Sequence, residues 1–269
     1  MIHKPTVNHI FDEKFKHGLD IIGLPTDLVA LLATEPTVLV QLRYNFLAGR
    51  YVLFQDPACT VPVEEVGDPI GGIIQPSLTL PPSDWSIVAV QGTDAARAVW
   101  GGVEVGAVFE SGAHMISTDP DGFIPATAQH CWVQKLEIDS IANNDNFFSQ
   151  FDSLKDGRMQ ANYDAASNAF RYRLDGGGTQ AAFATFPGSD PLGDWVIVGA
   201  RNGTNLHAEI YDTSGLVDSG IAAIEPDRGV AQAPSWISGA DGLDRHPDMR
   251  VTYLVVGDVE SKNAILEAL

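Results

Sequence analysis

The chain has 269 residues, of which 45% are hydrophobic and 19% are charged, a composition typical of a globular protein with a substantial core. Its 35 acidic residues oppose 16 basic ones, which gives a formal net charge of −19. A surface this negative repels phosphate backbones and anionic lipid, so the charge argues against nucleic-acid binding and against a membrane-surface role.

Segments that would direct the chain into a membrane or out of the cell are not visible in the sequence. No apolar run approaches the roughly 20 residues needed to span a bilayer. The N-terminal stretch MIHKPTVNH contains no apolar segment followed by a small-residue cleavage site, so we expect no secretory signal. Cys59 and Cys131 form no C-x-x-C pair. We expect buried free thiols, with a single disulfide bond between them as the alternative.

Residues 1–45 differ from the rest of the chain. This end is less acidic, owing to three lysines and to His3, His9 and His17. The histidines lack metal-ligand spacing, so we interpret them as surface residues. We expect a short helix over residues 28–33, ended before Pro36, and a strand over residues 38–43. The segment is predicted to be an N-terminal arm for attachment, or alternatively an ordinary first layer of the fold.

Residues 46–269 have the pattern of β structure. Turn-forming pairs such as Asp56-Pro57 and Gly71-Gly72 recur at short intervals and leave no room for long helices. Strands are expected over residues 86–90, 103–109, 114–117, 131–138, 147–151, 159–163, 169–174 and 180–186. Residues 212–249 are rich in loop formers, with one short strand at 236–237. The almost wholly apolar residues 251–256 predict a central strand, and residues 261–269 a closing helix.

The strongest single signal is a hairpin over residues 195–211. The run WVIVGAR at residues 195–201 is apolar on both faces, as expected for a strand that is covered on both sides. In the second strand Leu206, Ala208 and Ile210 alternate with polar residues and Tyr211. Asn202-Gly203 tolerates the positive φ angles of a two-residue turn. With about a dozen short strands and no long amphipathic helix, the chain is predicted to be an all-β sandwich or barrel.

Two stretches resemble the concanavalin A-like or laminin G-like sandwich domains of tailed-phage structural proteins. The segments RYVLFQDPACTVPV (residues 50–63) and VGDPIG (66–71) resemble a segment that precedes such sandwiches. The pieces GTDAARA (92–98), FESG (109–112) and MIST (115–118) resemble the opening of the sandwich, although Ala98 stands where proline is usual. A later section, from Gly193 to Asp212, follows the same pattern.

This resemblance implies a two-sheet antiparallel jelly-roll over residues 46–269, with residues 1–45 as an attachment segment. It also implies a non-enzymatic virion structural protein at the virion surface, as a capsid decoration, tail-fibre or baseplate component. Such a protein would contact other virion proteins through its N-terminal arm and form a homo-oligomer, for which we expect a trimer. The alternative is a receptor-recognition module that binds a cell-surface glycan, since fold alone does not decide function.

Catalysis is the third possibility, and the sequence argues against it. Laminarinase-type glycosidases share this fold and carry Glu-x-Asp-x-x-Glu on one strand, which Glu137 and Asp139 match in part. Retaining hydrolysis needs a second catalytic carboxylate, and the motif's third carboxylate is absent here. We therefore expect both residues to be solvated at a strand end and the protein to be no enzyme.

Two candidate binding features remain. The resemblance to laminin G-like domains implies Ca²⁺ at a sandwich rim, for which Asp119, Asp121 and Asp145 are the candidate ligands. Turn chemistry explains these residues equally well, because Asp and Asn bond their own backbone. We expect no other cofactor. For a glycan, the aromatic rings that could stack on sugars are Trp100, Tyr211 and Trp236, with burial in the core as the alternative.

Overall fold

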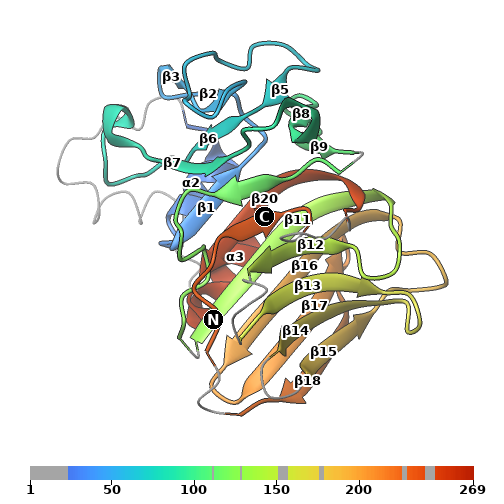
Figure 1. The fold of residues 1–269 in the computed structure, drawn as a ribbon. Helices are drawn as coiled ribbons and strands as arrows, with labels where there is room; N and C mark the ends of the chain where they lie inside the picture. The colour runs from blue at the N-terminus through green and yellow to red at the C-terminus, as the bar shows by residue number, and fades with distance from the viewer. Residues whose placement is uncertain are drawn as a thin grey trace.

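A computed structural model of the chain describes residues 24–110, 112–127, 129–150, 157–175, 179–225, 229–239 and 246–269. Nearly all of these residues belong to strands or to the turns between them, in two layers (Figure 1). The described part of the chain also has two short α-helices, α2 (Thr26–Leu32) and α3 (Lys262–Ala268). Three single-turn 3₁₀ helices complete it: η1 (Pro82–Asp84), η2 (Asp94–Ala96) and η3 (Val259–Ser261).

The two layers are antiparallel sheets, each with nine strands among the described residues. The first sheet has the order β18 (Gly215–Ala223), β17 (Asn205–Asp212), β16 (Gly193–Asn202), β11 (Gln129–Ser140), β20 (Asp248–Gly257), β9 (Ala107–Phe109), β8 (Ala98–Trp100) and β5 (Pro69–Ile70). β1 (Val38–Gln41) also pairs with β20. The predicted central position of the last strand is therefore confirmed.

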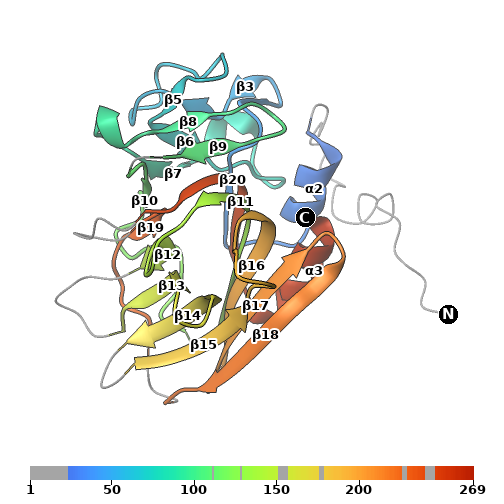
Figure 2. The same ribbon diagram turned by 90° about the vertical axis from the view of Figure 1, so that its right-hand side faces the viewer.

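The second sheet faces the first, as the edge-on view in Figure 2 shows. Its order is β15 (Thr179–Thr185), β14 (Ala169–Asp175), β13 (Met159–Asp164), β12 (Asn146–Gln150), β19 (Ser235–Ile237), β10 (Met115–Ser117), β7 (Ile87–Val90), β6 (Gly72–Ile74) and β4 (Leu53–Phe54). A small hairpin of β2 (Phe46–Leu47) and β3 (Arg50–Tyr51) stands apart. The predicted all-β, two-sheet antiparallel sandwich is confirmed.

The main core lies between the two sheets. Trp132 of β11 is fully buried and stacks on Phe148 and Phe170, with ring centroids 5.3 Å and 6.1 Å away. The alternation of β17 supplies Leu206, Ala208 and Ile210 to this core, as its sequence predicts. Burying each large apolar side chain contributes about 1.5–3 kcal/mol, so this layer carries most of the hydrophobic stabilisation.

A second core covers part of the outer face of the first sheet. Leu28 and Leu31 of α2 and Ile265 of α3 are fully buried in the same apolar cluster as Val198 and Val255. This explains why the first strand of the hairpin is apolar on both faces: Ile197 enters the main core, while Val198 lies under the helices. The helices leave the neighbouring part of that outer face uncovered, and there a groove lies.

The described part of residues 1–45 is built into the sandwich. β1 pairs with β20 over Val38–Gln41, and α2 packs on the first sheet. Residues 24–45 thus contribute a strand and a helix to the sandwich. His3, His9 and His17 lie outside the described residues. Attachment of this segment to another protein stays a prediction.

The two thiols are free, as predicted. Cys131 is buried and Cys59 half-buried, and burial raises the pKa of Cys131 to about 12 and that of Cys59 to about 11. Both thiols therefore stay protonated and unreactive near neutral pH. In the described residues, no helix has the length and apolar character needed to cross a bilayer.

Candidate functional site

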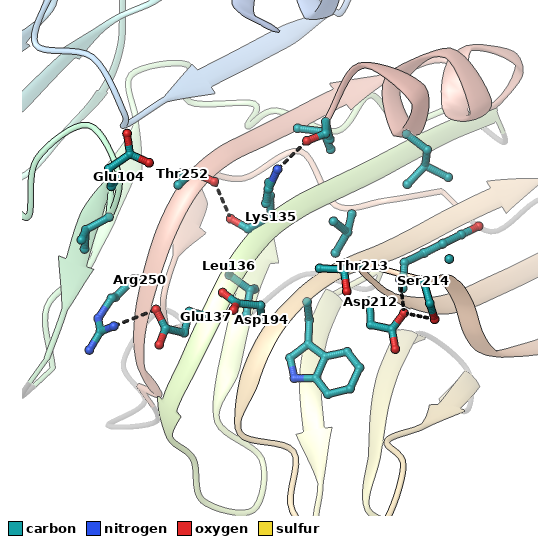
Figure 3. Close-up of a pocket in the computed structure, with 17 residues that line it drawn as sticks. Glu104, Lys135, Leu136, Glu137, Asp194, Asp212, Thr213, Ser214, Arg250 and Thr252 are labelled. Atoms are coloured by element: carbon teal, nitrogen blue, oxygen red, sulfur yellow. Dashed lines mark hydrogen bonds and ion pairs between the residues drawn. The ribbon is translucent and has the colours of Figure 1, made fainter.

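A groove on the outer face of the first sheet is the candidate site. It has a volume of about 620 Å³, within the usual range for small-molecule sites. Its floor crosses β20, β11, β16 and β17 (Figure 3). Its walls are the β8–β9 turn on one side, and the β17–β18 turn and the end of α3 on the other. Strand pairing therefore brings together residues that are far apart in the sequence.

A row of charged side chains crosses the floor. In the strand register Glu137 of β11 stands opposite Asp194 of β16 on one side and opposite Arg250 of β20 on the other. Arg250 donates to Glu137 Oε2 at 2.7 Å and lies 3.0 Å from Asp139 Oδ1. Opposed carboxylates on adjacent strands repel each other. The guanidinium of Arg250 offsets this repulsion from one side only.

Tyr211 forms part of the wall beside the helix. Its hydroxyl donates to Glu209 Oε2 at 2.6 Å, and Lys262 Nζ lies 2.5 Å from Glu209 Oε1. Burial raises the pKa of the Tyr211 phenol, and the hydrogen bond to Glu209 raises it further. The phenol therefore stays neutral, and these bonds fix the ring in place. The predicted sugar-stacking candidate Tyr211 does line the groove.

Lys135 lies between the floor and the end of α3. Its ammonium donates to the carbonyl oxygen of Leu269, and its own backbone carbonyl accepts from Thr252 Oγ1 at 3.4 Å. Burial and the charge of Arg43 both lower the pKa of Lys135. The hydrogen bond from this ammonium to Leu269 holds the helix end beside the groove.

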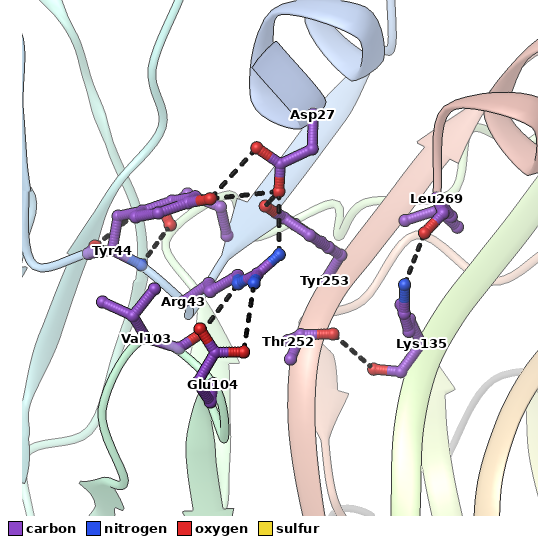
Figure 4. A network of polar contacts seen from close by, with 10 residues as sticks. Asp27, Arg43, Tyr44, Val103, Glu104, Lys135, Thr252, Tyr253 and Leu269 are labelled. Atoms are coloured by element: carbon purple, nitrogen blue, oxygen red, sulfur yellow. Dashed lines mark hydrogen bonds and ion pairs between the residues drawn. The ribbon is translucent and has the colours of Figure 1, made fainter. Parts of the chain in front are cut away.

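The opposite wall is fixed by a polar network at α2. Arg43 Nε donates to the Val103 carbonyl at 2.7 Å, and Arg43 NH2 lies 3.6 Å from Glu104 (Figure 4). The same guanidinium donates to Asp27 at 3.0 Å. The β8–β9 turn that carries Glu104 is thus tied to the first helix.

The other two predicted stacking residues lie elsewhere. Trp100 is 7% exposed, and its indole donates to the Arg43 carbonyl at 3.2 Å, so the core alternative describes it. Trp236 is half-buried and points to the outer face of the second sheet, since Ile237 beside it enters the core. Its ring lies 4.8 Å from that of His114, which stacks on His246 at 5.4 Å. Only Tyr211 belongs to the groove.

Two of the predicted Ca²⁺ ligands, Asp119 and Asp145, accept hydrogen bonds from backbone amides within their own turns. Asp119 Oδ1 accepts from the Asp121 amide at 2.9 Å, and Asp145 Oδ2 accepts from the Ala142 amide at 2.6 Å. Across the described ranges no three His, Cys, Asp or Glu side chains gather in a way that could hold a metal ion. A Ca²⁺ site that involves these residues stays a prediction.

Sequence reasoning singled out Glu137 but neither Asp194 nor Arg250. Asp194 lies in the Gly193-Asp194-Trp195 segment, whose resemblance pointed to the fold and not to a site. The groove residues come from separate strands, and only the β11 register with β16 and β20 makes them neighbours. The one signal in the sequence was that Asp194 is a charged residue directly before the apolar run of residues 195–201.

Comparisons with known proteins yield structural similarities alone, since no protein-family model and no curated protein matches the chain. The CBM2 module of Lactobacillus casei BL23 phage J-1 evolved Dit is 16% identical, with a TM-score of 0.35, over 53% of this chain and 67% of that one. A GH54 α-L-arabinofuranosidase mutant is 10% identical, with a TM-score of 0.49, over 74% of this chain and 50% of that one. Trypanosoma rangeli sialidase is 16% identical, with a TM-score of 0.48, over 81% of this chain and 35% of that one. At these TM-scores the similarities carry no argument about ligand or activity.

Proposed function

We propose that this chain is a non-enzymatic β-sandwich that binds a glycan in the outer groove and is displayed at the surface of a phage particle. The observation that carries the glycan part is the groove itself: about 620 Å³ of space lined by charged side chains, by apolar side chains such as Val196 and Leu266, and by the ring of Tyr211. Such a mixed lining suits a sugar, which has hydroxyl groups to bond and C–H faces to pack against apolar surface.

The chemistry of the lining supports a sugar. Carboxylate oxygens of Glu137, Asp194 and Asp212 accept hydrogen bonds from hydroxyl groups, and bonds to charged acceptors are about twice as strong as neutral ones. The amphipathic ring of Tyr211 offers an apolar surface for the C–H face of a sugar. The cross-links at Glu209 and Lys262 hold this ring in place before a ligand arrives, which lowers the entropy cost of binding.

A glycan array tests the proposal. The protein should be presented as an oligomer, because avidity makes weak binding of single sugars visible. We expect retained binding to a defined set of glycans. Tyr211→Ala and Asp194→Ala should each weaken this binding about 10-fold or more, the loss of one or two good contacts.

Trp236→Ala is the matched control, since it removes an aromatic ring from the opposite sheet. It should leave the array pattern unchanged. An array without hits would contradict the proposal, as would loss of binding in Trp236→Ala but not in Asp194→Ala. Asp194 is exposed, so its replacement should not prevent folding.

The phage part of the proposal is supported by the resemblance of residues 50–118 to phage structural proteins. In this view residues 1–45 contact other virion proteins, and the sandwich forms a homo-oligomer, for which we propose a trimer. Mass spectrometry of purified virions should detect the chain, and sedimentation should give the mass of three copies. Virions that lack the chain would refute this part and leave the glycan part standing.

One observation favours a second candidate function, glycoside hydrolysis. The opposed carboxylates of Glu137 and Asp194 supply, from neighbouring strands, the pair that the sequence motif lacks. Against it, Glu137 is ion-paired with Arg250 at 2.7 Å. We expect no release of reducing ends from β-glucans. Release that disappears in both Glu137→Gln and Asp194→Asn would establish the hydrolase instead.

A further inference from the structure

The groove has an excess of negative charge. Four carboxylates line it, on Glu104, Glu137, Asp194 and Asp212, against the two basic side chains of Lys135 and Arg250. They lie on the floor and on both walls of the groove (Figure 3).

Neither basic group is free to receive an anionic ligand. Arg250 is shared between Glu137 at 2.7 Å and Asp139 at 3.0 Å. Lys135 donates to the Leu269 carbonyl. The side chain of Asp194, in contrast, has no hydrogen bond or ion pair with any residue that the structure describes, although Asp194 stands directly opposite Glu137 in the strand register. The open positions in the groove are therefore hydrogen-bond acceptors with negative charge.

From this arrangement we infer that the groove selects uncharged glycans and excludes those that carry carboxylate or sulfate groups. The inference rests on the proposed glycan binding and names its ligand class. Sugar hydroxyls donate to Asp194 and Asp212, whereas a uronic or sialic acid would bring a further negative charge next to Glu137. The net charge of −19 adds a repulsive field around the whole molecule, and this field is strongest at low salt.

The experiment uses pairs of oligosaccharides that differ only in one acidic group, for example a terminal glucose against a terminal glucuronate. Binding is measured by calorimetry at low and at high sodium chloride. We expect the acidic member to bind about 10-fold more weakly at low salt, as one unfavourable charge contact in a partly screened site predicts. High salt should reduce the ratio of the two dissociation constants several-fold and leave the affinity for the neutral sugar unchanged.

Asp194→Asn is the variant that tests the site. It removes one charge but keeps an acceptor, so it should narrow the ratio about 3-fold at low salt. Asp84→Asn changes the net charge equally at an exposed position outside the groove lining and should leave the ratio as it is. Equal or tighter binding of the acidic sugar at low salt would overturn the inference while glycan binding itself stands. Binding of neither sugar would overturn the proposed function, and this inference with it.

Discussion

Asp27 is the residue that joins the first helix to the first sheet. Its carboxylate accepts from the Tyr253 hydroxyl at 2.7 Å, from the Tyr44 hydroxyl at 3.0 Å and from Arg43 at 3.0 Å (Figure 4). Burial acts to raise the pKa of Asp27. The bonds from Tyr253, Tyr44 and the Leu28 backbone outweigh burial with the help of Arg43, and the pKa lies below its ordinary value of 3.8.

We expect Asp27→Asn to lower the free energy of unfolding by about 2 kcal/mol at pH 7, the scale of one or two hydrogen bonds to a charged group. Because the pKa of Asp27 is depressed in the folded state, its contribution is full above pH 3.8 and is lost as the pH falls through the lower folded value. Urea unfolding at a series of pH values measures both effects. A difference between variant and wild type that stays constant down to pH 2 would contradict this account. Tyr44→Phe, which removes one bond, should cost less.

His130 is a buried group that the fold keeps neutral, whereas Asp27 is kept charged. Its side chain is 1% exposed, and its Nε2 lies 2.7 Å from the Tyr172 hydroxyl. Burial lowers the pKa of His130 from 6.5 to about 4. The unfolded chain therefore takes up a proton on this imidazole between these two pH values, while the folded chain does not.

His130 should therefore lower the free energy of unfolding as the pH falls from 6.5 to about 4, by about 3 kcal/mol in total. In His130→Gln, whose amide can still bond Tyr172, the slope of stability against pH should be smaller in this window. Chemical unfolding at half-unit pH steps measures the two slopes. Parallel slopes would show that His130 is not neutral in the folded protein.

At the scale of elements, the edge where the two sheets meet depends on one glycine. A Cβ atom added to Gly220 of β18 would lie 1.8 Å from the carbonyl oxygen of Phe183 in β15. The backbones of the two edge strands approach closely only because this side chain is missing.

Gly220→Ala should therefore force β18 and β15 apart and cost about 2 kcal/mol, as overpacking of a close contact does. Ser219→Ala is the control, because Ser219 is the exposed residue next to it in the same strand. Thermal unfolding of the two variants measures the difference. A Gly220→Ala protein as stable as the Ser219→Ala protein would refute the close approach.

The regular strands follow from the sequence, and the irregular ones do not. Alternation in Leu206, Ala208 and Ile210 predicts the buried face of β17 correctly, because one face of that strand meets the main core. The predicted strand over residues 103–109 is shortened to Ala107–Phe109, since the Gly106 amide bonds the Gly102 carbonyl at 2.8 Å and Gly106 has a φ of 79°. Local turn chemistry thus overrides an alternating pattern.

β18 is the longest of the strands that the sequence does not predict. It is largely exposed, its outward row includes Leu216 and Ile221, and a bulge opposite Ile210 and Tyr211 breaks its alternation. The hairpin turn also lies one residue later than predicted. Asn202 pairs with Asn205, so Gly203 and Thr204 form the turn, with Gly203 at a φ of 60°.

Of the groove residues, the sequence singles out Tyr211 as a binding candidate and Glu137 as a catalytic candidate that it then argues against. Asp194 and Arg250 become their neighbours only through strand register. The bulge in the β11–β20 pairing between Lys135 and Leu136 decides that Arg250 stands opposite Glu137. A one-residue change in register would turn these side chains to the other face of the sheet. Sequence spacing alone carries no information on such a bulge.

For the whole molecule, the net charge of −19 opposes compactness. We expect the melting temperature to rise by about 3 °C between low and near-molar sodium chloride, since salt screens the repulsion among exposed carboxylates. Potassium chloride should act equally, because screening does not depend on the identity of the cation. A melting temperature independent of salt would show that the carboxylates are already compensated in the fold.

The central place of β20 has a consequence for synthesis. This strand pairs with β1, β11 and β9, which makes it the axis of the first sheet, yet it begins only at Asp248. While the ribosome is still making the chain, β1 and β9 have no neighbour to join them to β11, and the apolar residues between the layers stay open to water. Nascent chains of this protein therefore pass through a long interval in which unpaired strand edges can meet the wrong partner, and closure of the first sheet must await the last strand.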